Sequence, residues 1–164
     1  MAIVQIADFK GLYHLAKTNL NTLLLQDCID KYEKKYLIRL FGVELYDLFI
    51  AGLLIVPIDA KWTALVDAFV VQDNNEIIES DGLKVMLLGF IYYEYSKLQL
   101  EKNTPIGNVQ PSSENSQMTG LSSMVVQRQF WAVDNFVAIQ KYVNLNNSLY
   151  STFNGAWIKY EYNW

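Results

Sequence analysis

The chain has 164 residues, of which 52% are hydrophobic and 18% are charged, and its formal net charge is −4. This length is typical of a single domain, and the acidic balance argues against proteins that bind nucleic acid through a strongly basic surface. The hydrophobic share is above that of an ordinary soluble domain, which predicts apolar surface that another protein covers.

Residues 1–145 are expected to form one mainly α-helical domain, a bundle of about four to five helices. Residues 1–20 are interpreted as an N-terminal arm, residues 103–123 as a long polar loop, and residues 146–164 as an extended C-terminal tail. A small β-hairpin is expected within the domain.

The first long helix is expected between Asn21 and Gly42, because asparagine accepts backbone N–H groups at helix starts and glycine is a common stop. Its apolar stripe consists of Leu25, Cys28, Ile29, Tyr32, Tyr36 and Leu40. A short helix over residues 43–51 follows, and Pro57 interrupts the apolar run after it. Asp59 then caps a third helix, whose apolar spacing continues through Trp62, Leu65, Val66, Phe69 and Val70.

Two apolar runs, residues 70–72 and 76–78, flank a polar turn and predict the hairpin. The next helix begins at Ser80 or Asp81 and reaches about residue 102. Its first half is apolar nearly all round, which indicates a central helix or one covered by a neighbouring subunit. The last helix, residues 121–145, is expected to place one stripe toward the core, with three charged residues off it. The stripe is Val126, Phe130, Val133, Val137 and Tyr142, and the charged residues are Arg128, Asp134 and Lys141.

The long loop and the tail are interpreted as the partner-binding surfaces. Loops of this length inside a compact domain are usually functional or disordered. The end of the tail alternates apolar and polar residues, as a half-buried strand does, so it can add to a sheet of another subunit or fold back on its own domain. The candidate interface residues are Pro105, Ile106, Val109, Pro111, Glu114, Met118, Trp157, Ile158, Tyr160, Tyr162 and Trp164.

A catalytic centre, a cofactor and a metal site are not expected. His14 and Cys28 are the only histidine and the only cysteine, so they can build neither a zinc site nor a disulfide. Packing of Cys28 in the core is favoured over a catalytic dyad with His14. Glu94, the lone charge in the apolar helix, is expected at its rim or bonded to a tyrosine hydroxyl rather than acting as a general base. Glu44 and Asp47 share a helix face and are expected to be solvated.

The beginning of the chain lacks the basic end and the apolar stretch of a signal peptide. Its longest apolar runs, residues 49–58 and 85–93, are shorter than the roughly 20 residues that a membrane span needs. With one cysteine and no expected disulfide, the chain is interpreted as made in the cytoplasm.

Three stretches resemble small neck proteins of tailed phages and prophages of gut Bacteroidetes, including crAss-like phages. They are residues 36–49 (YLIRLFGVELYDLF), 82–95 (GLKVMLLGFIYYEY) and 132–142 (AVDNFVAIQKY). The loop that contains Val109 and residues 113–116 belongs to the same resemblance, which covers residues 35–143.

The resemblance implies a head-to-tail connector, also called an adaptor or ring protein. Such proteins are helical bundles that assemble as a homo-oligomeric ring, commonly of twelve copies, in the virion neck. The portal protein lies above the ring, the next neck or tail protein docks below it, and DNA passes through without sequence-specific binding. An acidic channel suits this role because it repels the phosphates of the genome.

Three other functions remain open from the sequence. A tail-completion or stopper protein of the same particle would differ in its number of copies. A small helical enzyme would use Glu94 together with Glu44 or Asp47. A non-viral helical regulator would be a soluble monomer or dimer, and the aromatic content argues against a lone monomer.

Overall fold

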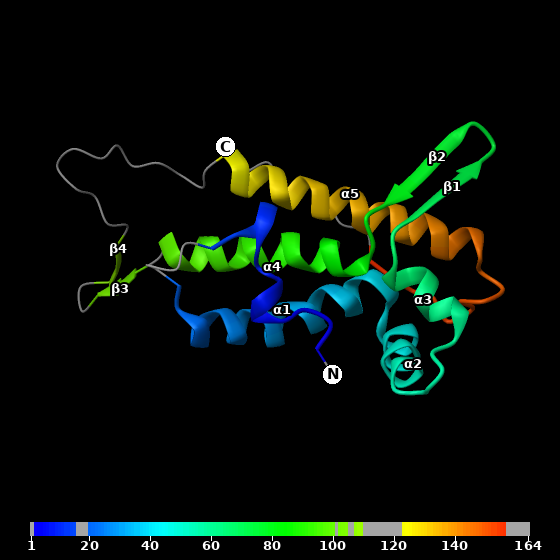
Figure 1. Cartoon of the computed structure of the whole chain (residues 1–164), viewed down its shortest axis with the longest axis horizontal. Coiled ribbons are helices and arrows are strands. Elements are labelled where there is room, and N and C mark those ends of the chain that lie inside the picture. Colours follow the sequence, from blue (N-terminus) through cyan, green and yellow to red (C-terminus); the bar gives the residue numbers. More distant parts are fainter. Residues whose placement is uncertain (1, 16–19, 101, 105–106, 110–122, 157–164) are drawn as a thin grey trace.

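The computed structural model describes residues 2–15, 20–100, 102–104, 107–109 and 123–156. Three long helices lie in layers, with α4 (Leu83–Leu100) between α1 (Thr22–Phe41) and α5 (Ser123–Leu145) (Figure 1). The fold is mainly helical with a small antiparallel hairpin, so the predicted fold class is confirmed.

Helix α1 begins and ends where the sequence predicts. The side-chain oxygen of Asn21 accepts a hydrogen bond from the backbone N–H of Leu24 at 3.1 Å. Gly42 ends the helix with a φ of 80°, a left-handed conformation that favours glycine, and it also precedes α2 (Val43–Leu53). All six residues of the predicted apolar stripe are buried: Leu25, Cys28, Ile29, Tyr32, Tyr36 and Leu40.

Helix α3 (Ala60–Val66) begins after Asp59, as predicted, but it is shorter than its apolar spacing suggested. Phe69 and Val70, which the helical pattern included, belong to strand β1 (Phe69–Asp73). The strand is favoured because the whole of β1 pairs antiparallel with β2 (Glu76–Ser80), which satisfies backbone groups on both.

The β1–β2 hairpin confirms the predicted turn. Asn74, at the turn, has a φ of 51°, a value that asparagine tolerates better than most residues. The inner face of the hairpin packs on α5, where the ring of Phe69 lies 4.7 Å from that of Tyr142. The outer face carries Val70 and Ile77, which are 68% and 69% exposed.

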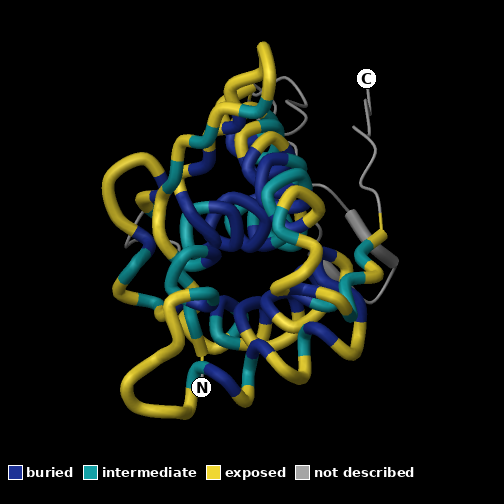
Figure 2. The backbone as a smooth tube through the Cα atoms, turned by 90° about the vertical axis from the view of Figure 1, so that its right-hand side faces the viewer, coloured by how far each residue is buried: buried dark blue, intermediate teal, exposed yellow. Residues whose placement is uncertain are grey.

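Helix α4 is the central helix, as its uniformly apolar first half predicts. The ring of Phe90 stacks on Tyr36 of α1 at 4.0 Å and meets Phe136 of α5 edge-on at 6.2 Å. Gly89 lets α5 approach closely, because a Cβ there would lie 2.8 Å from the Cβ of Ala132. Figure 2 shows that the buried backbone positions of the helices face one another, while the connections at the ends are exposed.

The predicted buried stripe of α5 is wrong in most positions. Val126, Phe130, Val137 and Tyr142 are only partly buried, whereas Arg128 is buried. The fully packed face includes polar residues that apolar spacing cannot reveal. It consists of Val125, Arg128, Ala132, Val133, Asn135, Phe136, Ala138, Ile139, Gln140 and Val143.

Hydrogen bonds explain why these polar residues are buried. Asn135 accepts from the Ser80 hydroxyl at 2.8 Å and from the Asp81 backbone N–H at 2.6 Å. Gln140 donates to the carbonyl oxygen of Leu40 at 3.2 Å. Each bond joins α5 to a residue far away in the sequence, so the face of α5 is set by tertiary partners.

The N-terminal arm packs across the helices. It contains two short 3₁₀ turns, η1 (Ile6–Asp8) and η2 (Gly11–Tyr13). The Glu33 carboxylate accepts backbone N–H groups of Ile3 and Val4 at 3.0 and 2.9 Å. Arg128 donates to the carbonyl oxygen of Leu12 at 2.9 Å, so both α1 and α5 hold the arm.

Two further segments complete the described chain. Strands β3 (Lys102–Thr104) and β4 (Gly107–Val109) form a second, shorter antiparallel hairpin beyond α4. After α5, residues 146–156 run back along the body, where Tyr150 is 1% exposed and Ala156 donates its N–H to the carbonyl oxygen of Arg39 at 2.8 Å.

Candidate functional site

Exposed apolar residues gather where α2 ends and the chain crosses to α3. Val56 is 89% exposed, and its neighbours Leu54 and Ile55 are 65% and 63% exposed. Leu48, five residues before the end of α2 at Leu53, is 51% exposed, and Ile58 is 38% exposed. We call these five residues the apolar end.

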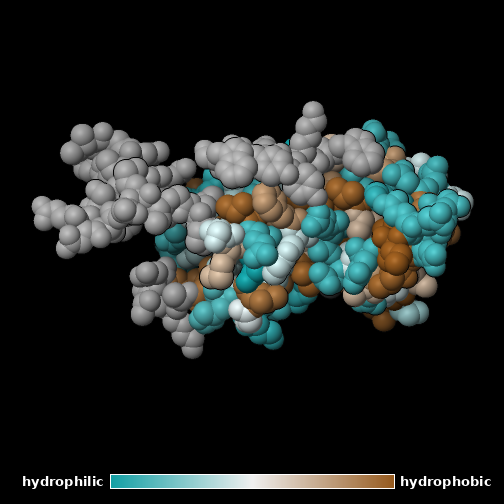
Figure 3. Space-filling view, turned by 90° about the horizontal axis from the view of Figure 1, so that it is seen from above, coloured by the Kyte–Doolittle hydropathy of each residue, from teal (hydrophilic) through white to brown (hydrophobic). Residues whose placement is uncertain are grey.

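Single exposed apolar side chains are ordinary, but a group of them close in sequence marks a protein-binding surface. Seen from above, apolar patches are scattered among the polar surface, including at the end of the molecule that carries the β1–β2 hairpin (Figure 3). Val70 and Ile77 on the outer face of that hairpin are a second exposed apolar pair. Sequence reasoning missed the apolar end, because the run before Pro57 was interpreted only as a helix break.

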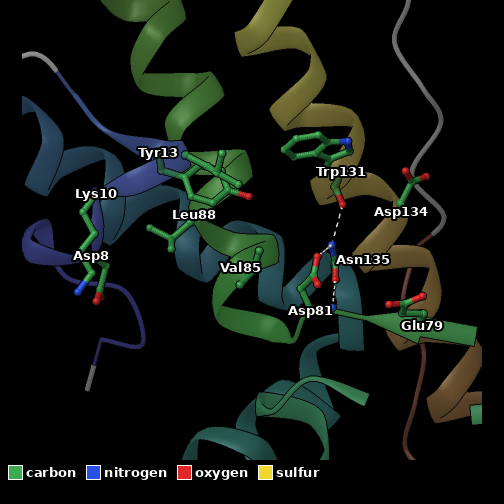
Figure 4. A pocket seen from close by; sticks show the side chains of 11 residues that line it. Asp8, Lys10, Tyr13, Glu79, Asp81, Val85, Leu88, Trp131, Asp134 and Asn135 are labelled. Atoms are coloured by element: carbon green, nitrogen blue, oxygen red, sulfur yellow. Dashed lines mark hydrogen bonds between the residues drawn. The ribbon is translucent and has the colours of Figure 1, made fainter. Parts of the chain in front are cut away.

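An open pocket of about 800 Å³ lies where the N-terminal arm, β2, α4 and α5 meet. Its apolar part comes from Val85 and Leu88 of α4, with the Trp131 indole on the α5 side (Figure 4). The charged residues that line it are Asp8, Lys10, Glu79, Asp81 and Asp134. We call this site the acidic pocket.

The acidic pocket is rigidly built on one side. Asn135 holds the backbone of Asp81 through its side-chain oxygen and also donates to the carbonyl oxygen of Trp131 at 2.9 Å. On the arm side, Lys84 pairs with Asp8 at 2.8 Å. Although burial alone would raise the pKa of Asp8, the Lys84 ammonium and the backbone N–H of Gln5 hold it below the usual value.

Glu94 lies between α4 and α1 and is engaged by residues of α1. It accepts a hydrogen bond from the Tyr36 hydroxyl at 2.9 Å, and the Lys35 ammonium is 3.9 Å away. This confirms the interpretation that Glu94 bonds a tyrosine hydroxyl. Burial, together with the Glu94 carboxylate, raises the pKa of Tyr36, so the pair is held as a neutral phenol donating to a carboxylate.

The remaining candidate catalytic residues are placed as their sequence context predicts. Cys28 is 2% exposed, and burial raises the pKa of its thiol, which disfavours the reactive thiolate. His14 is exposed at the end of η2. Glu44 and Asp47 are both exposed on α2. Within the described part of the chain, no group of three or more His, Cys, Asp or Glu side chains is arranged to hold a metal ion.

Of the predicted interface residues, Val109 lies at the end of β4. The others lie outside the described residues: Pro105, Ile106, Pro111, Glu114, Met118, Trp157, Ile158, Tyr160, Tyr162 and Trp164. Helices long and apolar enough to cross a membrane are not found among the described residues.

Comparisons with family models, with curated proteins and with solved structures find no match for this chain.

Proposed function

We propose that the chain is a structural protein of the phage neck, which forms a ring between the portal and the tail. The resemblance of residues 36–49, 82–95 and 132–142 to neck proteins suggests the role. The observation that carries the proposal is the apolar end, with Val56 89% exposed beside two other well-exposed aliphatic residues.

Exposed apolar surface of this kind is typical of sites that a partner protein covers. The body that presents it is well packed, because α1 and α5 both pack along α4, most of whose first half is buried. A ring needs two different contact patches on each subunit. The apolar end is one surface that a neighbouring subunit or the portal can cover, and it shares no residue with the acidic pocket.

The experiment is native mass spectrometry of the purified chain, alone and mixed with the portal protein encoded beside it. The proposal expects a species of ring mass, with twelve copies for an adaptor and six for a stopper or tail-completion protein. A chain that stays monomeric with and without portal would refute the proposal.

A pair of variants connects the assay to the apolar end. Ile55→Lys with Val56→Lys places two charges on it and should reduce ring formation at least tenfold, since buried charges without partners are costly. Leu23→Lys with Val43→Lys is the control, because both residues are exposed apolar residues, 79% and 61%, outside the apolar end. If both variants lost ring formation to the same extent, the loss could not be attributed to the apolar end.

A further inference from the structure

The exposed face of α1 is basic over its second half. Lys31, Lys34, Lys35 and Arg39 are all exposed. Glu33, the one acid among them in sequence, is 7% exposed and turned inward to the backbone of the N-terminal arm. Residues 31–39 therefore present four cations to solvent, of which Lys35 lies 3.9 Å from the Glu94 carboxylate, and we call these four residues the basic face.

The acidic pocket has the opposite character. Glu79 on the outer face of the hairpin and Asp81 at the beginning of α4 are exposed at its rim. The apolar lining from Val85, Leu88 and Trp131 suits the aliphatic stem of a lysine, whose ammonium would then reach the carboxylates.

These two surfaces cannot meet within one molecule. Helix α4 separates α1 from α5 (Figure 1), and the basic face lies on α1, with Lys35 on its α4 side, 3.9 Å from Glu94. The acidic pocket is formed on the other side, by α4, α5, the arm and the hairpin (Figure 4). Surfaces that are complementary but face apart on one subunit are what a head-to-tail contact requires.

We propose that the basic face of one copy docks on the acidic pocket of the next copy in the ring. This inference rests on the proposed ring and names the contact between its subunits. Nucleic acid is a poorer occupant of the basic face, because Asp27 and Asp30 extend the same exposed side of α1 and the whole chain has a net charge of −4.

The test uses two charge-reversal variants of the full chain. The first carries Lys31→Glu and Lys34→Glu on the basic face. The second carries Glu79→Lys and Asp81→Lys at the acidic pocket. Each variant places like charges across the proposed contact, so each alone should lower the fraction of ring, with or without portal, by at least about tenfold.

Mixing the two variants in equal amounts should restore the ring. An acidic α1 face then meets a basic pocket, and a basic α1 face meets an acidic pocket, so the restored ring alternates the two variants and holds an even number of copies. With one variant uniformly labelled with 15N, native mass spectrometry resolves this composition. Circular dichroism establishes that each variant is folded. If Glu79→Lys with Asp81→Lys does not fold, Glu79→Lys alone replaces it in the test.

The control carries Lys97→Glu, an exposed residue outside both surfaces, and is compared with Lys31→Glu alone so that the net charge changes by the same amount. It should assemble as the original chain does. The contact would be overturned if the charge-reversal variants formed rings normally, if mixing failed to restore assembly, or if Lys31→Glu with Lys34→Glu removed binding to duplex DNA and left the ring intact. If the original chain forms no ring with portal, the proposed function itself fails.

Discussion

Asn135 is the polar residue whose loss we expect to destabilise the fold most. It is 6% exposed, and its side-chain oxygen accepts hydrogen bonds from the Ser80 hydroxyl and the Asp81 backbone N–H at 2.8 and 2.6 Å. Replacement by alanine leaves both donors without this acceptor. A buried donor left unsatisfied costs about 1–3 kcal/mol.

The two donors are affected unequally. The Ser80 hydroxyl keeps one partner, because its oxygen still accepts from the Gly82 N–H at 3.1 Å. The Asp81 N–H has no second acceptor among the described contacts, but Asp81 is exposed, so water replaces part of the lost bond. We therefore expect Asn135→Ala to lower the free energy of unfolding by about 1–3 kcal/mol, against the roughly 5–15 kcal/mol of a typical domain.

Urea denaturation followed by circular dichroism measures this change. Asn144→Ala is the matched control, because Asn144 lies on the same helix, is exposed and gains the same helix propensity on replacement. The control should stay within about 0.5 kcal/mol of the original chain. If the two variants differed by less than that amount, the hydrogen bonds of Asn135 would not hold α5 to the β2–α4 junction.

Three further predictions concern single residues. Gly89→Ala should destabilise the protein by about 1–3 kcal/mol in thermal denaturation, because the new methyl group would lie 2.9 Å from the Arg128 carbonyl oxygen. A glycine-to-alanine change inside a helix usually stabilises it, and that result would contradict the close approach of α4 and α5. Burial raises the pKa of Glu33 above its usual 4.5, so the folded state binds the proton more tightly than the unfolded state. The free energy of unfolding should consequently fall as pH rises from 4.5 through the folded pKa of Glu33. Denaturation curves of Glu33→Gln at the same pH values should lack this dependence. If the original chain and the variant lost stability in parallel as pH rises, Glu33 would not be its source. Cys28 should react with a thiol reagent only on unfolding, because it is buried and the pKa of its thiol is raised; rapid labelling of the native protein would show otherwise.

The sequence predicts those elements whose signals are local. Asn21 caps α1 through a residue three positions away, and Gly42 stops it through its own backbone conformation. The β1–β2 turn contains Asn74, whose left-handed φ is an intrinsic preference of asparagine. Each of these features depends on neighbours in the chain, so one sequence is enough to place it.

Features that depend on distant partners are not predictable in the same way. The buried face of α5 contains Asn135 and Gln140, whose partners Ser80 and Leu40 are 55 and 100 residues away in sequence. Apolar spacing alone therefore selects the wrong stripe. The hydrogen bond between Tyr36 and Glu94 spans 58 residues, and it was predicted only as one way to satisfy a lone charge.

The surface features have a similar explanation. An apolar run such as the one before Pro57 has the same composition whether it is buried or exposed, so the sequence alone could not identify the apolar end. The acidic pocket joins residues from four segments of the chain. The sequence shows each of its carboxylates as an ordinary solvated residue, and only the fold brings them together.

The most direct test of the central claim is the number of copies in the particle. Quantitative mass spectrometry of purified virions, with the portal protein as internal standard, measures this number. The account predicts that the chain is present in the virion in equal number to a twelvefold portal. Purified virions that contain portal and tail proteins but not this chain would contradict it.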